Sequence, residues 1–254
     1  MLVALRKSFN FHQNSQKIFF RIFLFFILAQ FIFWLKTENT KPDVNIVPPL
    51  PSKYSIEALS LGDSEFYFRV LALKIQNAGD SFGRFTALKF YDYSKLYQWF
   101  KILDSLDSKS KFVPVLASYY YSQTQKIEDT IYMINYLDEY ASRDLDENWW
   151  WMFQAMNIAN ITLKDEKLAL KLAYKLSKNN AKKAPLWTKQ MPAFIHAKLG
   201  EDCAAFAVIE KVLKDNESGI RKISAEEMDF MNHFIKDRLG KLKNKKFNPL
   251  QCKH

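Results

Sequence analysis

The sequence predicts an all-α protein in which an array of helix hairpins, an α-solenoid, follows a single N-terminal transmembrane helix. Phe is abundant, with 22 residues, whereas Gly is scarce, with six among 254, and this balance suits helices better than a turn-rich β fold. Residues 146–178 contain two helical patterns joined by a short turn. The second pattern has one apolar stripe, made of Leu168, Ala169, Leu172, Ala173 and Leu176.

The N-terminal region contains the segment expected to cross the membrane. Residues 1–17 are polar and basic, and residues 18–35 form an apolar run in which Arg21 is the only charge. Eighteen helical residues span about 27 Å, close to the thickness of the hydrocarbon core of a bilayer. Arg21 can extend back to the headgroups, and Trp34 suits the far interface. We therefore expect residues 18–35 to form a transmembrane anchor.

The charges that flank this span predict its orientation. Because basic residues precede it, we expect residues 1–17 in the cytoplasm and the body in the periplasm, in a single-pass protein of the bacterial inner membrane. A cleaved signal peptide is one alternative, because only the 14 residues 22–35 are free of charge. The segment KTENTKP follows without a cleavage pattern of the Ala-x-Ala type, which favours retention. An interfacial helix is a second alternative.

Residues 36–53 contain four prolines and little periodicity. Pro48, Pro49 and Pro51 favour extended polyproline structure, so this segment is expected to be a linker between the span and a folded domain. The alternative is an extended segment packed on that domain.

The folded domain is expected over residues 54–240, before a basic tail at 241–254. Gly62 interrupts the first helical pattern, and Asp63 is suited to cap the next helix. Residues 79–91 are irregular. Ser224 and Glu227 form a capping box for the last helix. The other helices are expected at residues 92–106, 111–122, 126–142, 147–162, 165–178, 186–198 and 202–215.

Residues 199–216 carry a resemblance to a known repeat. Leu199 and Gly200 resemble the inter-helix Leu-Gly of the tetratricopeptide repeat, a hairpin of about 34 residues, and Ala205 resembles the small residue of its second helix. The equivalent anchor positions along the chain, 34, 39 and 36 residues apart, are Leu96, Thr130, Ala169 and Ala205. The repeat-closing proline is mostly missing. The resemblance therefore implies a divergent tetratricopeptide-like array over 92–216, and the alternative is a non-repetitive all-α domain.

Motifs that would indicate catalysis are weak. GDSFG, residues 79–83, satisfies the pattern of a nucleophile elbow, but no strand is expected before Ser81, so we interpret Ser81 as a turn residue. His196 and His233 lie in expected helices without a paired acid. Cys203, among alanines, is expected to be a buried, inert thiol, although a bond to Cys252 is compatible with a location outside the cytoplasm. We predict no catalytic residue, no metal site and no cofactor.

The net charge of +10 does not indicate a nucleic-acid partner. Of the 37 basic residues, five lie in residues 1–36 and five in residues 241–254, where no acidic residue occurs. The remaining 27 are balanced by the 27 acidic residues. A nucleic-acid-binding domain carries its basic excess on the folded body.

Two aromatic triplets are the candidate protein-binding residues. Three successive helical residues spread over about 200°, so one buried stripe cannot hold a whole triplet, and at least one ring of each should reach the surface. We expect Trp150 to be buried, on one line with Phe153 and Asn157. The candidates for partner contact are Trp149, Trp151, Tyr119, Tyr120 and Tyr121.

These features lead to an expected function of a non-catalytic kind. The resemblance implies a membrane-anchored scaffold or assembly factor of the bacterial cell envelope that binds other membrane or periplasmic proteins. One alternative is an envelope enzyme that acts on peptidoglycan or lipid through an unidentified catalytic acid. Another is a soluble periplasmic helical protein released by signal cleavage.

Overall fold

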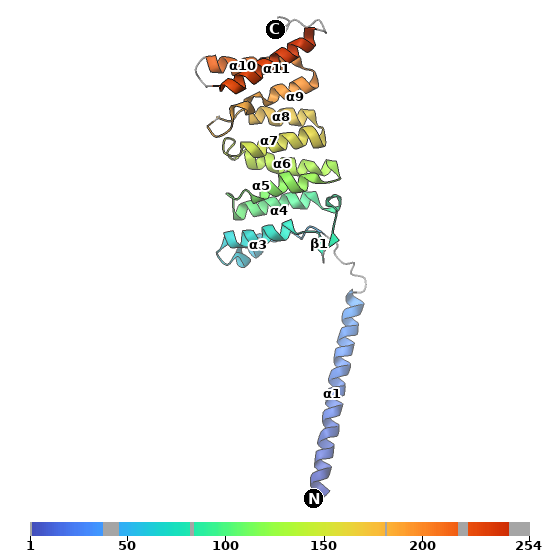
Figure 1. Ribbon diagram of the computed structural model, residues 1–254. Coiled ribbons are helices and arrows are strands. Elements are labelled where there is room, and N and C mark those ends of the chain that lie inside the picture. The colour runs from blue at the N-terminus through green and yellow to red at the C-terminus, as the bar shows by residue number, and fades with distance from the viewer. Residues whose placement is uncertain (1, 38–45, 82–83, 181, 218–222, 244–254) are drawn as a thin grey trace. The chain divides into compact units, whose positions relative to one another are not determined.

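The computed structural model describes residues 2–37, 46–81, 84–180, 182–217 and 223–243 (Figure 1). The chain divides into two compact units, residues 1–44 and residues 45–254. The described residues are mostly helical, which confirms the predicted all-α class. The strands among the described residues are two short ones, β1 (Asp80–Ser81) and β2 (Arg84–Phe85), which pair antiparallel.

The first unit contains one helix, α1 (Leu2–Thr37). Within it, residues Ile18–Lys36 have a mean hydropathy of 2.3, and by length and composition this stretch can cross a membrane. The apolar side chains from Ile18 to Leu35 are exposed in this unit. The helix thus has the length and polarity that the sequence predicted for an anchor.

The second unit contains helices that follow one another along the chain. They agree with the expected helices to within a few residues, although several are divided into α, 3₁₀ and π segments. The elements are α2 (Lys53–Ser60), α3 (Ser64–Gln76), η1 (Leu88–Phe90), α4 (Tyr93–Leu106), α5 (Phe112–Val115), η2 (Leu116–Tyr120), η3 (Tyr121–Gln123), η4 (Ile127–Asp129), α6 (Thr130–Ala141), α7 (Trp149–Asn157), η5 (Ile158–Leu163), α8 (Glu166–Leu176), η6 (Leu186–Gln190), α9 (Met191–Leu199), α10 (Asp202–Glu217) and α11 (Ala225–Lys243).

Local side-chain chemistry fixes several helix ends. The carboxylates of Asp63, Asp92 and Asp165 accept hydrogen bonds of 2.8–2.9 Å from backbone N–H groups at the starts of α3, α4 and α8. Ser224 and Glu227 form the predicted capping box of α11. Gly200 ends α9 with a φ of +78°, a conformation that glycine adopts without the strain of a Cβ.

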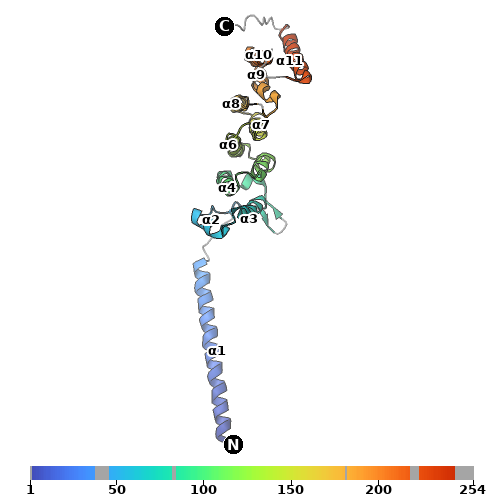
Figure 2. The ribbon, with the colours of Figure 1, turned by 90° about the vertical axis from the view of Figure 1, so that its left-hand side faces the viewer.

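Each helix of the second unit packs mainly on its neighbours in the sequence. The most extensive contacts join α6 to α7, α7 to α8, α8 to α9 and α9 to α10. Figure 2 shows α4, α6 and α8 on one side of this stack and α7 and α9 on the other. The helices that contain or begin at the first three predicted anchor positions, Leu96, Thr130 and Ala169, therefore lie on the same side of the stack.

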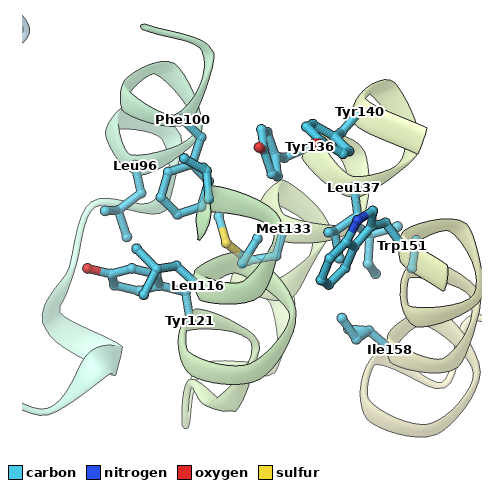
Figure 3. Packing of buried hydrophobic residues seen from close by; sticks show 14 of the residues in the cluster. Leu96, Phe100, Leu116, Tyr121, Met133, Tyr136, Leu137, Tyr140, Trp151 and Ile158 are labelled. Atoms are coloured by element: carbon cyan, nitrogen blue, oxygen red, sulfur yellow. The ribbon is translucent and has the colours of Figure 1, made fainter. Parts of the chain in front are cut away.

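The core confirms the burial of those anchor positions. Leu96, Thr130, Ala169 and Ala205 are all at most 3% exposed. A large core cluster extends from Val47 to Ile195, and a smaller one joins α9, α10 and α11. Figure 3 shows the middle of the large cluster, where Phe100 and Leu116 lie near Tyr121, and Leu137 lies near Trp151.

Residues 46–48 correct the predicted linker. Val47 is buried, and the backbone carbonyl of Pro48 accepts a hydrogen bond of 2.8 Å from the indole of Trp99 on α4. The expectation of a free spacer is therefore wrong for these residues, because an apolar side chain and a paired carbonyl attach them to the body. Residues 38–45 of the predicted linker lie outside the described residues, as do residues 244–254 of the predicted tail.

Candidate functional site

The triplet Trp149–Trp151 divides as helical geometry requires, but with a different member inside. Trp151 is buried, at 7% exposure, whereas Trp150 is 37% exposed and Trp149 is half-buried. The expectation that Trp150 is buried and Trp151 faces outward is therefore wrong. The reason is that α7 packs between α6 and α8, so its buried face contains Trp151, Met152, Ala155 and Met156.

The triplet Tyr119–Tyr121 also places one ring in the core. Tyr119 and Tyr120 are exposed, but Tyr121 is fully buried and donates a 2.6 Å hydrogen bond to the carbonyl of Ile75. Its own carbonyl accepts from the hydroxyl of Tyr93, and burial raises the pKa of the Tyr121 phenol. Tyr121 therefore holds α3 and α4 against η3, and its predicted place on a binding surface is wrong.

The exposed rings of both triplets meet across two helical segments. The indole N–H of Trp150 on α7 donates a 2.9 Å hydrogen bond to the hydroxyl of Tyr119 on η2. Trp150 also packs against Trp149 and Phe153, with ring centroids 5.4 and 5.5 Å apart. Trp187 on η6 continues this contact, because its ring lies 5.5 Å from Trp149 and 5.1 Å from Phe153. We call Tyr119, Trp149, Trp150, Phe153 and Trp187 the aromatic row.

The aromatic row borders a groove at the C-terminal end of the body. This groove, of about 360 Å³, is lined by Trp187, Gln190, Met191, Phe194, Glu226, Glu227 and Phe230. Phe194 of α9 packs against Phe230 and Phe234 of α11, with centroids 5.9 and 5.2 Å apart. Trp187 belongs to both features, so the aromatic surface extends from η2 to α11.

Gln190 is the unusual residue in this groove. Its side chain is 1% exposed, and neither its amide oxygen nor its amide nitrogen has a hydrogen-bond partner within the part of the chain that the structure describes. Buried amides are nearly always paired, because an unpaired one loses its hydrogen bonds to water without compensation. The sequence offered no signal for this residue or for the meeting of Trp187, Phe194 and Phe230, which depends on how η6, α9 and α11 pack.

A single buried carboxylate stands out among the acidic groups of the described residues. Asp104 is 4% exposed, and its burial raises the pKa of the carboxyl. Tyr136 donates to one of its oxygens at 2.9 Å and Arg143 to the other at 2.5 Å. Both oxygens are thus held by protein donors, and Asp104 lines neither of the two cavities described here.

His196 corrects the expectation that it has no paired acid. Its Nδ1 lies 2.6 Å from a carboxylate oxygen of Glu201, and its Nε2 lies 2.7 Å from the hydroxyl of Tyr174. Tyr174 lines a second cavity of about 360 Å³ beside α8, α9 and α10, together with Lys178, Lys189 and Lys211. Lys189 donates to the carbonyls of Ser177 and Asn179, which ties it to the end of α8.

The structure also places Ser81 and Cys203, two residues that the sequence analysis considered for chemical roles. The interpretation of Ser81 as a turn residue is wrong, because Ser81 belongs to β1 and pairs with Arg84 of β2. Phe82 and Gly83 of the motif lie outside the described residues. Cys203, half-buried on α10, is disulfide-bonded, so the expectation of an inert thiol is wrong. Among the described residues no cluster of three or more His, Cys, Asp or Glu is placed to hold a metal ion.

Comparisons with known proteins add no relationship to this description. The chain matches no protein-family model, and no curated protein or solved structure is significantly similar to it.

Proposed function

We propose that this protein is a membrane-anchored, non-catalytic scaffold or assembly factor of the bacterial cell envelope, whose helical body holds other membrane or periplasmic proteins. The observation that carries this proposal is the aromatic row. Tyr119 and Trp150 are 51% and 37% exposed on neighbouring helical segments and are joined by a hydrogen bond. Rigid, exposed Trp and Tyr side chains of this kind are typical centres of protein–protein interfaces.

The architecture supports the proposal in two further ways. We interpret the stack of α4 to α10 as a divergent tetratricopeptide-like solenoid, because its buried anchor residues recur every 34 to 39 positions. The first three of them belong to α4, α6 and α8, which lie on the same side of the stack. Helical arrays of this type present long surfaces made from many helices. The aromatic row crosses the segments η2, α7 and η6 in this manner.

The proposal includes the location of the protein in the inner membrane, with its helical body in the periplasm. The apolar stretch Ile18–Lys36 supports a single-pass inner-membrane protein. The basic residues that precede it support a cytoplasmic N-terminus. The disulfide at Cys203 supports a periplasmic body, since disulfides persist mainly in oxidising compartments. If the N-terminal segment is instead cleaved, the same body would be a soluble periplasmic protein.

The carboxylates favour a scaffold over an envelope enzyme that acts on peptidoglycan or lipid. A general acid needs a raised pKa and access to substrate. Asp104 has the raised pKa but is enclosed by Tyr136 and Arg143. Glu226 lines the groove, but hydrogen bonds from its own backbone N–H and from Ser224 lower the pKa of its carboxyl.

Photo-cross-linking in the native membrane tests the proposed function. A benzoylphenylalanine placed at Tyr119 should form cross-links to a defined envelope protein, identified by mass spectrometry, and Trp150→Ala should reduce their yield at least tenfold. The control is the same photoreactive residue at Phe85, an 81% exposed ring on β2 outside the aromatic row. Equal cross-linking from both positions, or no effect of Trp150→Ala, would contradict the proposal.

A further inference from the structure

The outward face of α3 is apolar, where the outward face of a solvated helix is polar. The residues that α3 buries on the side facing the core and α4 are Phe68, Leu71, Ala72 and Ile75. Phe66, Val70 and Leu73 are spaced four and three residues apart, so they lie together on the opposite side of the helix. Their side chains are 63%, 46% and 56% exposed. We call these three residues the α3 stripe.

The α3 stripe belongs to an uncovered end of the body. The preceding helix α2 contacts α3 but buries none of its own residues, and Leu59 and Leu61 at its end are 62% and 90% exposed. At the other end of the body (Figure 1), α11 exposes mainly polar residues, among them Asp229, His233 and Lys236. The terminal helices of a helical array need a polar outer face to remain in water. The apolar outer face of α3 therefore indicates a surface that something other than water covers.

The length of chain between α1 and the body identifies the bilayer as the covering surface. Val47 is buried and the carbonyl of Pro48 is bonded to Trp99, so the chain joins the body beside α3 and α4. Thr37 ends α1 and Ile46 follows nine positions later, a stretch that spans about 32 Å at most, whatever its path. If α1 crosses the membrane, the α3 end of the body thus stays within reach of the lipid surface. Such a tether gives even a weak contact a high effective concentration, whereas a second copy or a soluble partner has to arrive by diffusion.

The charges beside the α3 stripe suit the headgroup region of a bilayer. Glu65 and Arg69 form an exposed ion pair on one flank of the stripe, and the exposed Lys74 lies on the other flank. A helix with one apolar face and charged margins inserts that face about 5–10 Å into the boundary between headgroups and acyl chains. Because both signs of charge are present, we expect the stripe to bind zwitterionic lipid without a requirement for anionic headgroups.

We propose that the α3 stripe docks on the surface of the bilayer that holds α1, so that Phe66, Val70 and Leu73 enter the interface between headgroups and acyl chains. This inference rests on the membrane anchor of the proposed function and adds a second contact with lipid. Docking fixes the orientation of the body, and with it the height of the aromatic row above the membrane.

Spin labels on the full-length protein test the docking. The protein is reconstituted at one copy per nanodisc of palmitoyl-oleoyl-phosphatidylcholine, and a nitroxide is attached through p-acetylphenylalanine in place of Phe66, which leaves the cysteines unchanged. Electron paramagnetic resonance then measures collisions of the label with oxygen, which concentrates among acyl chains, and with a nickel chelate, which stays in water. We expect at least threefold fewer nickel collisions, and more oxygen collisions, at Phe66 than at Phe230, an exposed ring on α11 that serves as the control.

A substitution within the α3 stripe shows whether the stripe itself causes this difference. Leu73→Ser in the protein labelled at Phe66 should raise nickel collisions about threefold, because it removes apolar contact with lipid. Gln76→Ser changes an exposed residue of α3 outside the stripe and should leave the collisions unchanged. Circular dichroism of both variants checks that the body remains folded. The comparison of Phe66 with Phe230 needs neither variant, so it decides the matter even if Leu73→Ser fails to fold.

A third label separates failure of the inference from failure of the anchor. A nitroxide at Phe26, within the apolar stretch, should show many oxygen collisions and few nickel collisions. If it does so while Phe66 behaves like Phe230, the inference is overturned and the anchor stands. Nickel access at Phe26 would overturn both. A label at Phe66 that is open to nickel at one copy per nanodisc, but shielded from both reagents at two copies, would overturn the inference in favour of contact with a second copy.

Discussion

At the scale of single residues, Asp104 shows how this body accommodates a buried charge. The carboxylate lies on α4 and receives hydrogen bonds from Tyr136 on α6 and from Arg143 just after α6. Arg143 remains 42% exposed, so the guanidinium keeps part of its hydration while neutralising a carboxylate that is 3% exposed. The pair therefore joins α4 to α6 at a smaller desolvation cost than a fully enclosed ion pair would incur.

Removal of Arg143 should destabilise the protein in a pH-dependent way. Burial already raises the pKa of Asp104 above its ordinary 3.8, so the folded state binds this proton more readily than the unfolded state does. Because of this carboxyl, the free energy of unfolding falls as the pH rises from the ordinary pKa of 3.8, which applies to the unfolded state, to the higher pKa of the folded state. Arg143→Gln should raise the Asp104 pKa further and lower the free energy of unfolding by about 1–3 kcal/mol at pH 7.

The pH profile distinguishes this effect from a simple loss of packing. In urea titrations followed by circular dichroism, the difference between Arg143→Gln and the parent should shrink as the pH falls and Asp104 becomes protonated in the folded state of both proteins. Arg69→Gln is the matched control, because it makes the same charge change in the exposed pair with Glu65 and should cost less than about 1 kcal/mol. A loss from Arg143→Gln that is equal at all pH values would contradict this account.

At the scale of elements, two glycines with the same backbone conformation have different surroundings. Gly79 precedes β1 with a φ of +80°, and Gly200 ends α9 with a φ of +78°. A Cβ on Gly79 would lie 2.1 Å from the hydroxyl oxygen of Tyr91, whereas a Cβ on Gly200 would meet nothing within 4 Å. Tyr91 is buried and donates to the carbonyl of Ala78, so it cannot move aside without losing that hydrogen bond.

Substitution by alanine should therefore separate the two positions. Gly200→Ala should cost about 1–2 kcal/mol, the strain of a left-handed residue that has a Cβ. Gly79→Ala should cost about 1–3 kcal/mol more, because the clash displaces Tyr91. Chemical denaturation of both variants measures the difference, and equal costs would show that Tyr91 does not constrain the chain between α3 and β1.

At the scale of the whole molecule, α1 and the body are separate compact units, and the proposed function requires them to serve different compartments. Arg6, Lys7 and Lys17 precede the apolar stretch, which predicts a cytoplasmic N-terminus. The proposed function likewise places the disulfide at Cys203 outside the cytoplasm, where disulfides persist.

Reporter fusions test this orientation. Alkaline phosphatase fused after Lys53 should be active, because it matures only outside the cytoplasm, and a fluorescent protein that folds only in the cytoplasm should stay dark at the same position. N-terminal sequencing of the mature protein should recover residues before Ile18 if the span is retained as an anchor. The reverse reporter pattern would contradict the topology, and a new N-terminus after Leu35 would instead identify a cleaved signal.

The sequence by itself determined the helices and the apolar N-terminal stretch, because both depend on local chemistry. The caps at Asp92 and Asp165 act within three residues, and the recurrence of Leu96 and Ala169 on apolar stripes marks the buried faces without knowledge of any neighbour. The small strand pair and the packing of Val47 were not predicted, since short contacts of this kind depend on what lies next to them.

Only the tertiary structure decided which aromatic rings form the candidate surface. Neighbouring residues on a helix are about 100° apart, and a run of three identical side chains contains no signal for the one that faces the core. The packing of α7 between α6 and α8 buried Trp151 and exposed Trp150. The packing of η6, α9 and α11 placed Trp187 and Phe230 around Gln190, a juxtaposition of residues 40 positions apart that arises when helices dock.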